Sequence, residues 1–113
     1  MLMTMKLNAA PFEKIARGTK TVELRLFDEK RRTLSVGDEI VFTHTEKDGA
    51  QLRTRVTALY RADSFAELFL TDVFEKSGFE GKTREQALQA MREYYSAADE
   101  NRFGVLGIEI KPI

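Results

Sequence analysis

Residues 39–60, EIVFTHTEKDGAQLRTRVTALY, decide the fold, because they predict two antiparallel strands joined by a tight turn. The stretches from Glu39 to Thr45 and from Gln51 to Tyr60 are both rich in residues that favour strands. Between them, Glu46-Lys47-Asp48-Gly49 carries the Asp-Gly pair that is typical of a hairpin. We therefore expect a β-hairpin at the centre of the chain.

The residues before the hairpin predict two further strands and one short helix. Met3–Leu7 indicates a strand, and residues 10–18 indicate a helix with Pro11 in its first turn and Gly18 at its end. Residues 19–27 again favour a strand, which a charged connection joins to the hairpin. We expect this strand and the hairpin to form a β-meander.

The residues after the hairpin change to a helical pattern. Asp63 or Ser64 is placed to cap a first helix, and Thr83 with Gln86 forms a capping box that opens another. Residues 96–103 predict one more short helical turn, and residues 105–110 a final strand that returns near the first. The pattern is α+β, with about five strands, an early short helix and a helical insertion before the last strand. A small closed or partly closed β-barrel suits it, because closure protects strand edges.

Composition excludes several classes of protein. With 113 residues, 42% of them hydrophobic, the chain suits a single domain over residues 1–113. The absence of cysteine excludes thiol nucleophiles, zinc ribbons, iron–sulfur sites and disulfides, and the single histidine, His44, excludes multi-histidine metal sites. We therefore expect no metal and no cofactor.

No apolar run approaches the ~20 residues of a membrane helix, and the N-terminus does not resemble a signal peptide. A cytoplasmic protein without membrane contact is expected.

Eighteen basic and eighteen acidic residues give a net charge of zero, but the charges divide along the chain. Residues 1–61 hold twelve Lys or Arg and eight Asp or Glu, which gives +4, whereas residues 62–113 hold six and ten, which gives −4. Seven of the basic residues lie between Lys14 and Arg32. Such a segment provides either a solvated surface or a basic face that attracts phosphate.

The basic segment contains Gly18-Thr19-Lys20-Thr21-Val22-Glu23-Leu24-Arg25. In a regular strand, Thr21, Glu23 and Arg25 share one face, and Lys20 lies at the strand entry, where its amine reaches the same cleft. A lysine, a glutamate and an arginine side by side suit the binding of a phosphate or a nucleobase edge. The alternative is a ladder of ion pairs on a solvated sheet face, which contributes little energy.

The spacing G-x-K-x-x-E-x-R, met by Gly18, Lys20, Glu23 and Arg25, resembles the signature of the ASCH domain family in the PUA-like superfamily. The resemblance extends over nearly the whole chain, including residues 26–31, 36–42, 94–96 and 104–110. It implies a small PUA-like β-barrel whose cleft is lined by Lys20, Glu23 and Arg25, with Gly18 at the backbone turn. It also implies that the cleft binds RNA, as single-stranded RNA or as a small nucleotide or modified nucleoside.

Enzymatic alternatives follow from the same resemblance. One branch of the family contains amidohydrolases that deacetylate N4-acetylcytidine, but their nucleophilic threonine position is Glu23 here. In this alternative Lys20 is the base and either the nearby hydroxyl of Thr21 or a water is the nucleophile, and no second acid after the hairpin clearly matches that branch. Some members are described as ribonucleases, for which this sequence offers no specific catalytic pair. A third alternative is a protein-interaction module in which the motif is structural.

Other residues extend the candidate site. Arg31 and Arg32 are expected to form a basic rim that attracts nucleic acid without sequence preference. Tyr60 is placed to approach the cleft, and Tyr94 to stack a base at its mouth, each with core packing as the alternative. His44 is expected to be structural. The sequence leaves the oligomeric state open.

Overall fold

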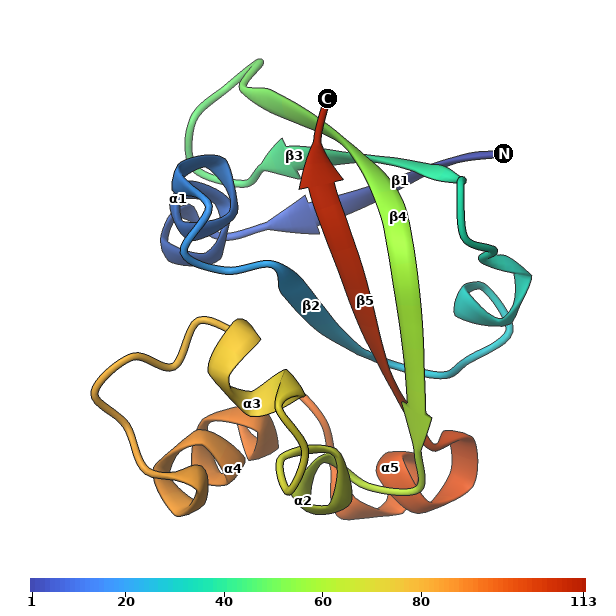
Figure 1. The fold of residues 1–113 in the computed structure, drawn as a ribbon, viewed down its shortest axis with the longest axis vertical. Coiled ribbons are helices and arrows are strands. Elements are labelled where there is room, and N and C mark those ends of the chain that lie inside the picture. The colour runs from blue at the N-terminus through green and yellow to red at the C-terminus, as the bar shows by residue number, and fades with distance from the viewer.

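A curled five-stranded sheet forms the body of the protein, and the computed structural model describes all of residues 1–113. The strands are β1 (Leu2–Leu7), β2 (Val22–Leu26), β3 (Glu39–His44), β4 (Gln51–Ala62) and β5 (Val105–Pro112). The helices are α1 (Ala9–Arg17), α2 (Phe65–Leu68), α3 (Val73–Lys76), α4 (Arg84–Arg92) and α5 (Ala97–Phe103), with a short 3-10 helix, η1 (Arg31–Thr33). The strand order is β1-β3-β4-β5-β2, which gives a half-barrel of the α+β class with its helices before and after the central strands (Figure 1).

The central hairpin is confirmed. Strands β3 and β4 pair antiparallel from Glu39 opposite Arg55 to Thr43 opposite Gln51. His44 is buried and organises the turn that follows, because its Nδ1 accepts hydrogen bonds from the backbone N–H groups of Glu46 and Lys47 at 3.0 and 2.9 Å. His44, the one histidine of the chain, therefore has a structural role in the turn between β3 and β4.

The predicted meander is wrong for the strand that carries the motif. Strand β2 pairs with β5 and not with β3. The reason is the connection that follows β2, since residues 27–38 contain η1 and bury Leu34 in the core instead of forming a tight turn. A connection of this length crosses one end of the half-barrel and leaves β2 at the far edge of the sheet.

The last strand does not return to the first, as predicted, but lies between β4 and β2. Strand β5 pairs antiparallel with both neighbours, while β1 pairs parallel with β3 at the opposite edge of the sheet. Strands β1 and β2 are therefore the two edges of the half-barrel, and no backbone ladder joins them.

Two apolar cores hold the structure together. The first lies inside the half-barrel, where alternate residues of β1 (Met3, Met5, Leu7) pack with Phe42 of β3 and Ile15 of α1. The second core packs the apolar face of β2 (Val22, Leu24 and Leu26) against the helical insertion, which gathers at one end of the sheet. In Figure 1 this insertion (α2 to α5) lies at the bottom of the view and α1 lies beside β3 at the left.

The predicted caps at Ser64 and Thr83 are confirmed, and Ser96 adds a cap that was not predicted. Ser64 caps α2, Ser96 caps α5, and Thr83 with Gln86 forms both hydrogen bonds of a capping box at the start of α4.

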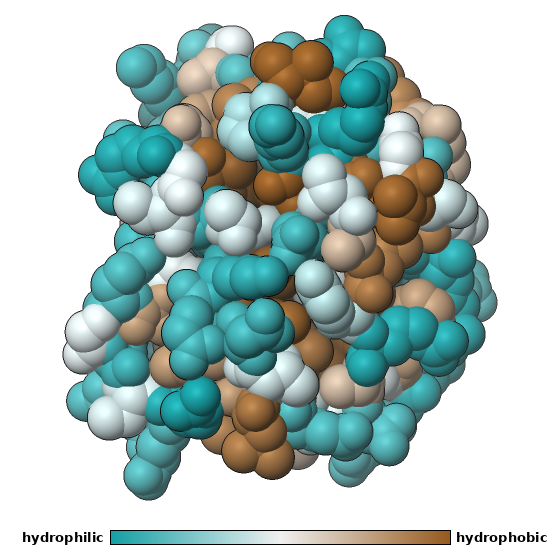
Figure 2. Space-filling model, viewed as in Figure 1, coloured by the Kyte–Doolittle hydropathy of each residue, from teal (hydrophilic) through white to brown (hydrophobic).

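The molecular surface, viewed as in Figure 1, mixes hydrophilic and hydrophobic residues, and no single hydrophobic patch dominates it (Figure 2). None of the helices has the length and apolar character that crossing a membrane requires.

Candidate ligand-binding site

The two edge strands approach each other along a seam, which we define as the line between the free edges of β1 and β2. Side chains cross the seam where backbone hydrogen bonds do not. Arg25 donates to the carbonyl oxygen of Lys6 at 3.0 Å, and Lys30 donates to the carbonyl oxygen of Thr4 at 3.1 Å. One cation of β2 and one of the connection that follows it thus donate to carbonyl groups of β1.

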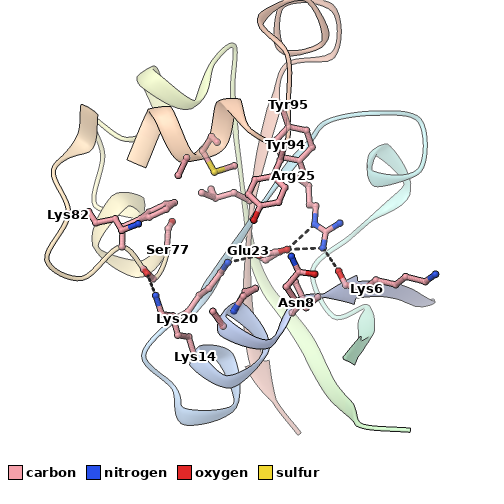
Figure 3. Close-up of a pocket in the computed structure, with 18 of the residues that line it drawn as sticks. Lys6, Asn8, Lys14, Lys20, Glu23, Arg25, Ser77, Lys82, Tyr94 and Tyr95 are labelled. Atoms are coloured by element: carbon pink, nitrogen blue, oxygen red, sulfur yellow. Dashed lines mark hydrogen bonds and ion pairs between the residues drawn. The ribbon is translucent and has the colours of Figure 1, made fainter. Parts of the chain in front are cut away.

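A cavity of about 460 Å³ opens at the seam, between β2, the start of α1 and the helical insertion (Figure 3). Its charged lining is strongly unbalanced, since only one carboxylate, Glu23, faces five cations. These cations are Lys6, Lys14, Lys20, Arg25 and Lys82. A cavity with this excess of positive charge favours an anionic ligand.

Glu23 lies at the centre of the motif and is only 5% exposed. Lys20 Nζ lies 2.7 Å from Glu23 Oε1, while the guanidinium of Arg25 reaches Oε2 through Nε at 2.9 Å and through a terminal nitrogen at 2.8 Å. Both carboxylate oxygens are therefore occupied. Of the two roles predicted for Glu23, holding the two cations in place fits this geometry.

The ionisation of Glu23 follows from these contacts. Burial alone would raise the pKa of its carboxyl group, but the charges and hydrogen bonds of Lys20 and Arg25 together hold that pKa below its usual value. Glu23 is thus a buried carboxylate at neutral pH, and it fixes the two cations beside the cavity.

Two glycines position Lys20. Gly18 ends α1 with a φ of 82°, and this left-handed turn lets the backbone N–H groups of Thr19 and Lys20 both donate to the carbonyl of Lys14. Gly78 has a φ of 84°, and a Cβ atom there would lie 3.1–3.3 Å from the side-chain carbons of Lys20. The stem of Lys20 is therefore confined between the end of α1 and the loop after α3.

Several lining residues were not predicted as site residues. Lys14 donates to the carbonyl of Gly78 at 2.8 Å and lies 3.7 Å from Glu80, so it ties α1 to the loop after α3. Asn8 accepts a hydrogen bond from the Thr45 hydroxyl at 2.9 Å. The basic segment between residues 14 and 32 already included Lys14, but no motif in the sequence marked Lys6, Asn8 or Lys82.

Aromatic side chains lie beside the charged centre. Tyr94 and Tyr95 follow α4, and Figure 3 shows them on one side of Glu23, with Asn8 and Lys6 on the other. Tyr94 is 67% exposed, whereas Tyr95 packs against Phe65 with ring centroids 5.7 Å apart. Burial raises the pKa of the Tyr95 hydroxyl. Tyr94 is therefore the ring free to stack on a ligand, and Tyr95 belongs to the wall.

Two of the predicted site residues lie outside the cavity. Thr21 precedes β2, its N–H donates to the carbonyl of Lys76, and its side chain lines a separate shallow hollow with Lys76 and Glu109. Tyr60 donates its hydroxyl proton to Glu109 at 3.0 Å on that side as well. Thr21 was expected to share a cleft with Glu23 and Arg25, but it lines this separate hollow and not the cavity.

The predicted basic rim is also separate from the cavity. Arg31 pairs with Asp28 at 3.1 Å, and Arg32 lies 4.6 Å from the centre of the Phe27 ring. Arg61 covers the same ring at 4.0 Å. Lys30 links this group to the seam through its hydrogen bond to Thr4. These cations lie beyond the cavity on the connection after β2 and at the end of β4.

The family model of the ASCH domain matches residues 5–113. The chain belongs to the ASCH domain family. Among solved structures, the hypothetical protein PH0355 is 34% identical over the full length of both chains, with a TM-score of 0.90. Protein PF0455 from Pyrococcus furiosus is also 34% identical, with a TM-score of 0.80, over 100% of this ASCH domain and 98% of that chain.

More distant members share the fold. The ASCH protein from Zymomonas mobilis is 18% identical, with a TM-score of 0.65, over 97% of this chain and 68% of that one. The ASCH domain from Lactobacillus crispatus is 16% identical, with the same TM-score, over 98% and 79%. No curated protein matches the chain.

Proposed function

We propose that this ASCH domain binds RNA, or a nucleotide or modified nucleoside derived from it, in the cavity at the seam. The observation that carries the proposal is the lining of five cations around one carboxylate that is already fully paired. Lys20 and Arg25 keep donor capacity beyond Glu23, because an ammonium has three donors and a guanidinium has five. They are the groups that would meet phosphate oxygens.

The aromatic residues support the same ligand class. Tyr94 is exposed at the cavity and offers a face for a base, and stacking on such a ring is worth about 1–3 kcal/mol per base. The combination of a cationic pocket and a free aromatic ring suits a charged ligand with a flat apolar part. A nucleotide has both features.

The amidohydrolase alternative lacks a serine or threonine nucleophile paired with a base in this geometry. Thr21 is not among the residues that line the cavity. Of the other hydroxyl groups at the cavity, Ser77 donates to the carbonyl of Val73 and Thr45 donates to Asn8. A nucleophile and its base need to be within hydrogen-bond reach of each other, and no such pair supports a hydrolase or a ribonuclease here.

The proposal is tested by a ¹H–¹⁵N NMR titration with AMP, CMP, GMP, UMP, cytidine, N4-acetylcytidine and a short single-stranded RNA. We expect shifts that map to Lys20, Arg25 and Tyr94, and no acetate in the N4-acetylcytidine sample. Acetate release would replace the binding proposal with the hydrolase alternative. An absence of shifts with every ligand would contradict it.

Two variants identify the cavity as the binding site. Lys20→Ala and Arg25→Ala are each expected to weaken nucleotide binding at least tenfold, because each removes a charge-assisted hydrogen bond. Arg53→Ala is the matched control, since it also removes one positive charge but from a side chain on the outer surface that pairs with Glu39. Equal affinity in all three variants would place the ligand elsewhere.

A further inference from the structure

The backbone of β2 presents an unpaired edge to the seam. In a strand, alternate residues turn their N–H and C=O groups to the same side. The carbonyl of Thr21 accepts from Ile110 at 2.9 Å, and the N–H of Phe27 donates to Gly104 at 2.9 Å. The odd-numbered residues therefore face β5, and the even-numbered residues Val22, Leu24 and Leu26 face the free edge.

Leu24 is the one of these three residues that lines the cavity. Glu23 and Arg25 of β2 and Lys6 and Leu7 of β1 line the same cavity, which therefore opens along the seam that the Leu24 peptide groups face. Neither the N–H nor the C=O of Leu24 has a partner in the chain, although the residue is only 5% exposed. Buried peptide groups without partners are rare, and at a binding site a ligand is their natural partner.

We propose that the N–H and C=O of Leu24 read the Watson–Crick edge of a nucleobase in this cavity. This inference rests on the proposed function and adds the means of base recognition to it. A donor and an acceptor from one residue point the same way, so they match a ligand that carries an acceptor and a donor side by side. Nucleobases present such a pair on that edge in a rigid plane, whereas a phosphate presents acceptors alone.

The charged side chains of the cavity leave the Leu24 carbonyl as an acceptor for a base. Lys20 and Arg25 offer only donors, and both oxygens of Glu23 are occupied by these cations. A base amino or imino group needs an acceptor, and the Leu24 carbonyl is a free one held on a rigid strand. The cations would then hold the phosphate while the strand edge selects the base.

A peptide that extends the sheet is the competing ligand for an open strand edge. Such a ligand requires a row of exposed peptide groups along the strand. Here Val22 and Leu26 have the same orientation as Leu24, but they do not line the cavity. Contact with the cavity at one residue of this edge fits a planar base better than a strand.

The first test uses the unmodified protein. GMP and UMP are compared with 1-methyl-GMP and 3-methyl-UMP, in which a methyl group replaces the N–H of the Watson–Crick edge and leaves the charge of the base unchanged. We expect the methylated form of the tighter nucleotide to bind about tenfold more weakly or worse. We also expect that nucleotide to slow hydrogen exchange at the Leu24 amide and not at Leu26.

The second test removes the donor. Leu24→Pro deletes an N–H that makes no ladder hydrogen bond, which is the situation in which proline is tolerated in an edge strand. It should weaken binding of the tightest nucleotide about tenfold. Leu26→Pro is the matched control, because it deletes an equivalent free N–H and a buried leucine outside the cavity. Its affinity should stay within about twofold of the native protein.

The outcomes separate the two proposals. If no nucleotide binds, the proposed function and this inference both fail. If methylated and unmethylated nucleotides bind equally and the Leu24 amide is not protected, the function stands and this inference is overturned. Protection that spreads to Val22 and Leu26 would indicate a strand-like ligand and would also overturn it. If Leu24→Pro does not fold, the comparison on the unmodified protein decides.

Discussion

Replacing Glu23 with glutamine tests the charged centre of the site. The side chain of Glu23 is 6% exposed, and it neutralises Lys20 and Arg25, whose side chains are 11% and 17% exposed. The Glu23→Gln variant keeps the size of the side chain but leaves two poorly solvated cations close together. Breaking a buried ion pair on one side costs about 3–5 kcal/mol. Since an amide oxygen still accepts one hydrogen bond, we expect a loss of roughly 3 kcal/mol in the free energy of unfolding.

The loss depends on pH in a defined direction. The pKa of Glu23 in the folded protein lies below its ordinary value of 4.5. Its contribution to stability is therefore fully present above that ordinary value and disappears as the pH falls through the folded pKa. The native protein and the variant should differ by a constant amount near neutrality, and this difference should shrink steadily below about pH 4.5.

Urea unfolding from pH 3 to 8, supported by calorimetry, measures both effects. A loss of 3 kcal/mol corresponds to roughly 12 °C in melting temperature for a domain of this size. Glu39→Gln is the control, because Glu39 also pairs with two arginines but on the exposed face of the sheet, and its loss should be smaller. A loss below about 1 kcal/mol in Glu23→Gln, or a difference that does not change down to pH 3, would refute the buried ion-pair argument.

Four further changes probe the surroundings of the site. Gly78→Ala should weaken nucleotide binding more than Gly81→Ala does, because both glycines have positive φ but only a Cβ at Gly78 meets the stem of Lys20; equal affinities by isothermal titration would remove the packing argument. Thr83→Ala should lower the free energy of unfolding by about 1 kcal/mol through loss of the capping box, and an unchanged urea midpoint would contradict this. Thr21→Ala should leave nucleotide affinity unchanged, since Thr21 lies outside the cavity; a tenfold loss would show that the side chain reaches the ligand. Arg32→Ala should reduce the salt dependence of RNA binding by about 0.7 in slope while sparing mononucleotides, and an unaltered slope would remove Arg32 from the RNA contact.

Local sequence signals predicted the elements well. The Asp-Gly turn, the alternation of β3, the caps at Ser64 and Thr83 and the glycine at the end of α1 all act within a few residues, so a single chain contains the whole signal. The order of the strands was not predictable in this way. The pairing of β2 with β5 joins residues about eighty or more positions apart, and only the packing of Leu34 in the core shows why the connection after β2 does not form a tight turn to β3.

The same distinction between local and long-range signals applies to the residues of the candidate site. Lys20, Glu23 and Arg25 lie within six residues, so their spacing already indicated an ion-pair cluster. Lys82 and Asn8 reach the same cavity from the helical insertion and from the start of α1, which no local pattern could indicate. Thr21 was misplaced, since it lines the separate hollow with Lys76 and Glu109 and not the cavity.

The seam has a mechanical consequence. Two hydrogen bonds, from Arg25 and Lys30, are the side-chain ties between its edges, and both are exposed to solvent. Widening the mouth of the cavity therefore breaks no rung of the β-ladder. Ligand entry and release at the seam then depend on the side chains of two cations and not on the pairing of strands.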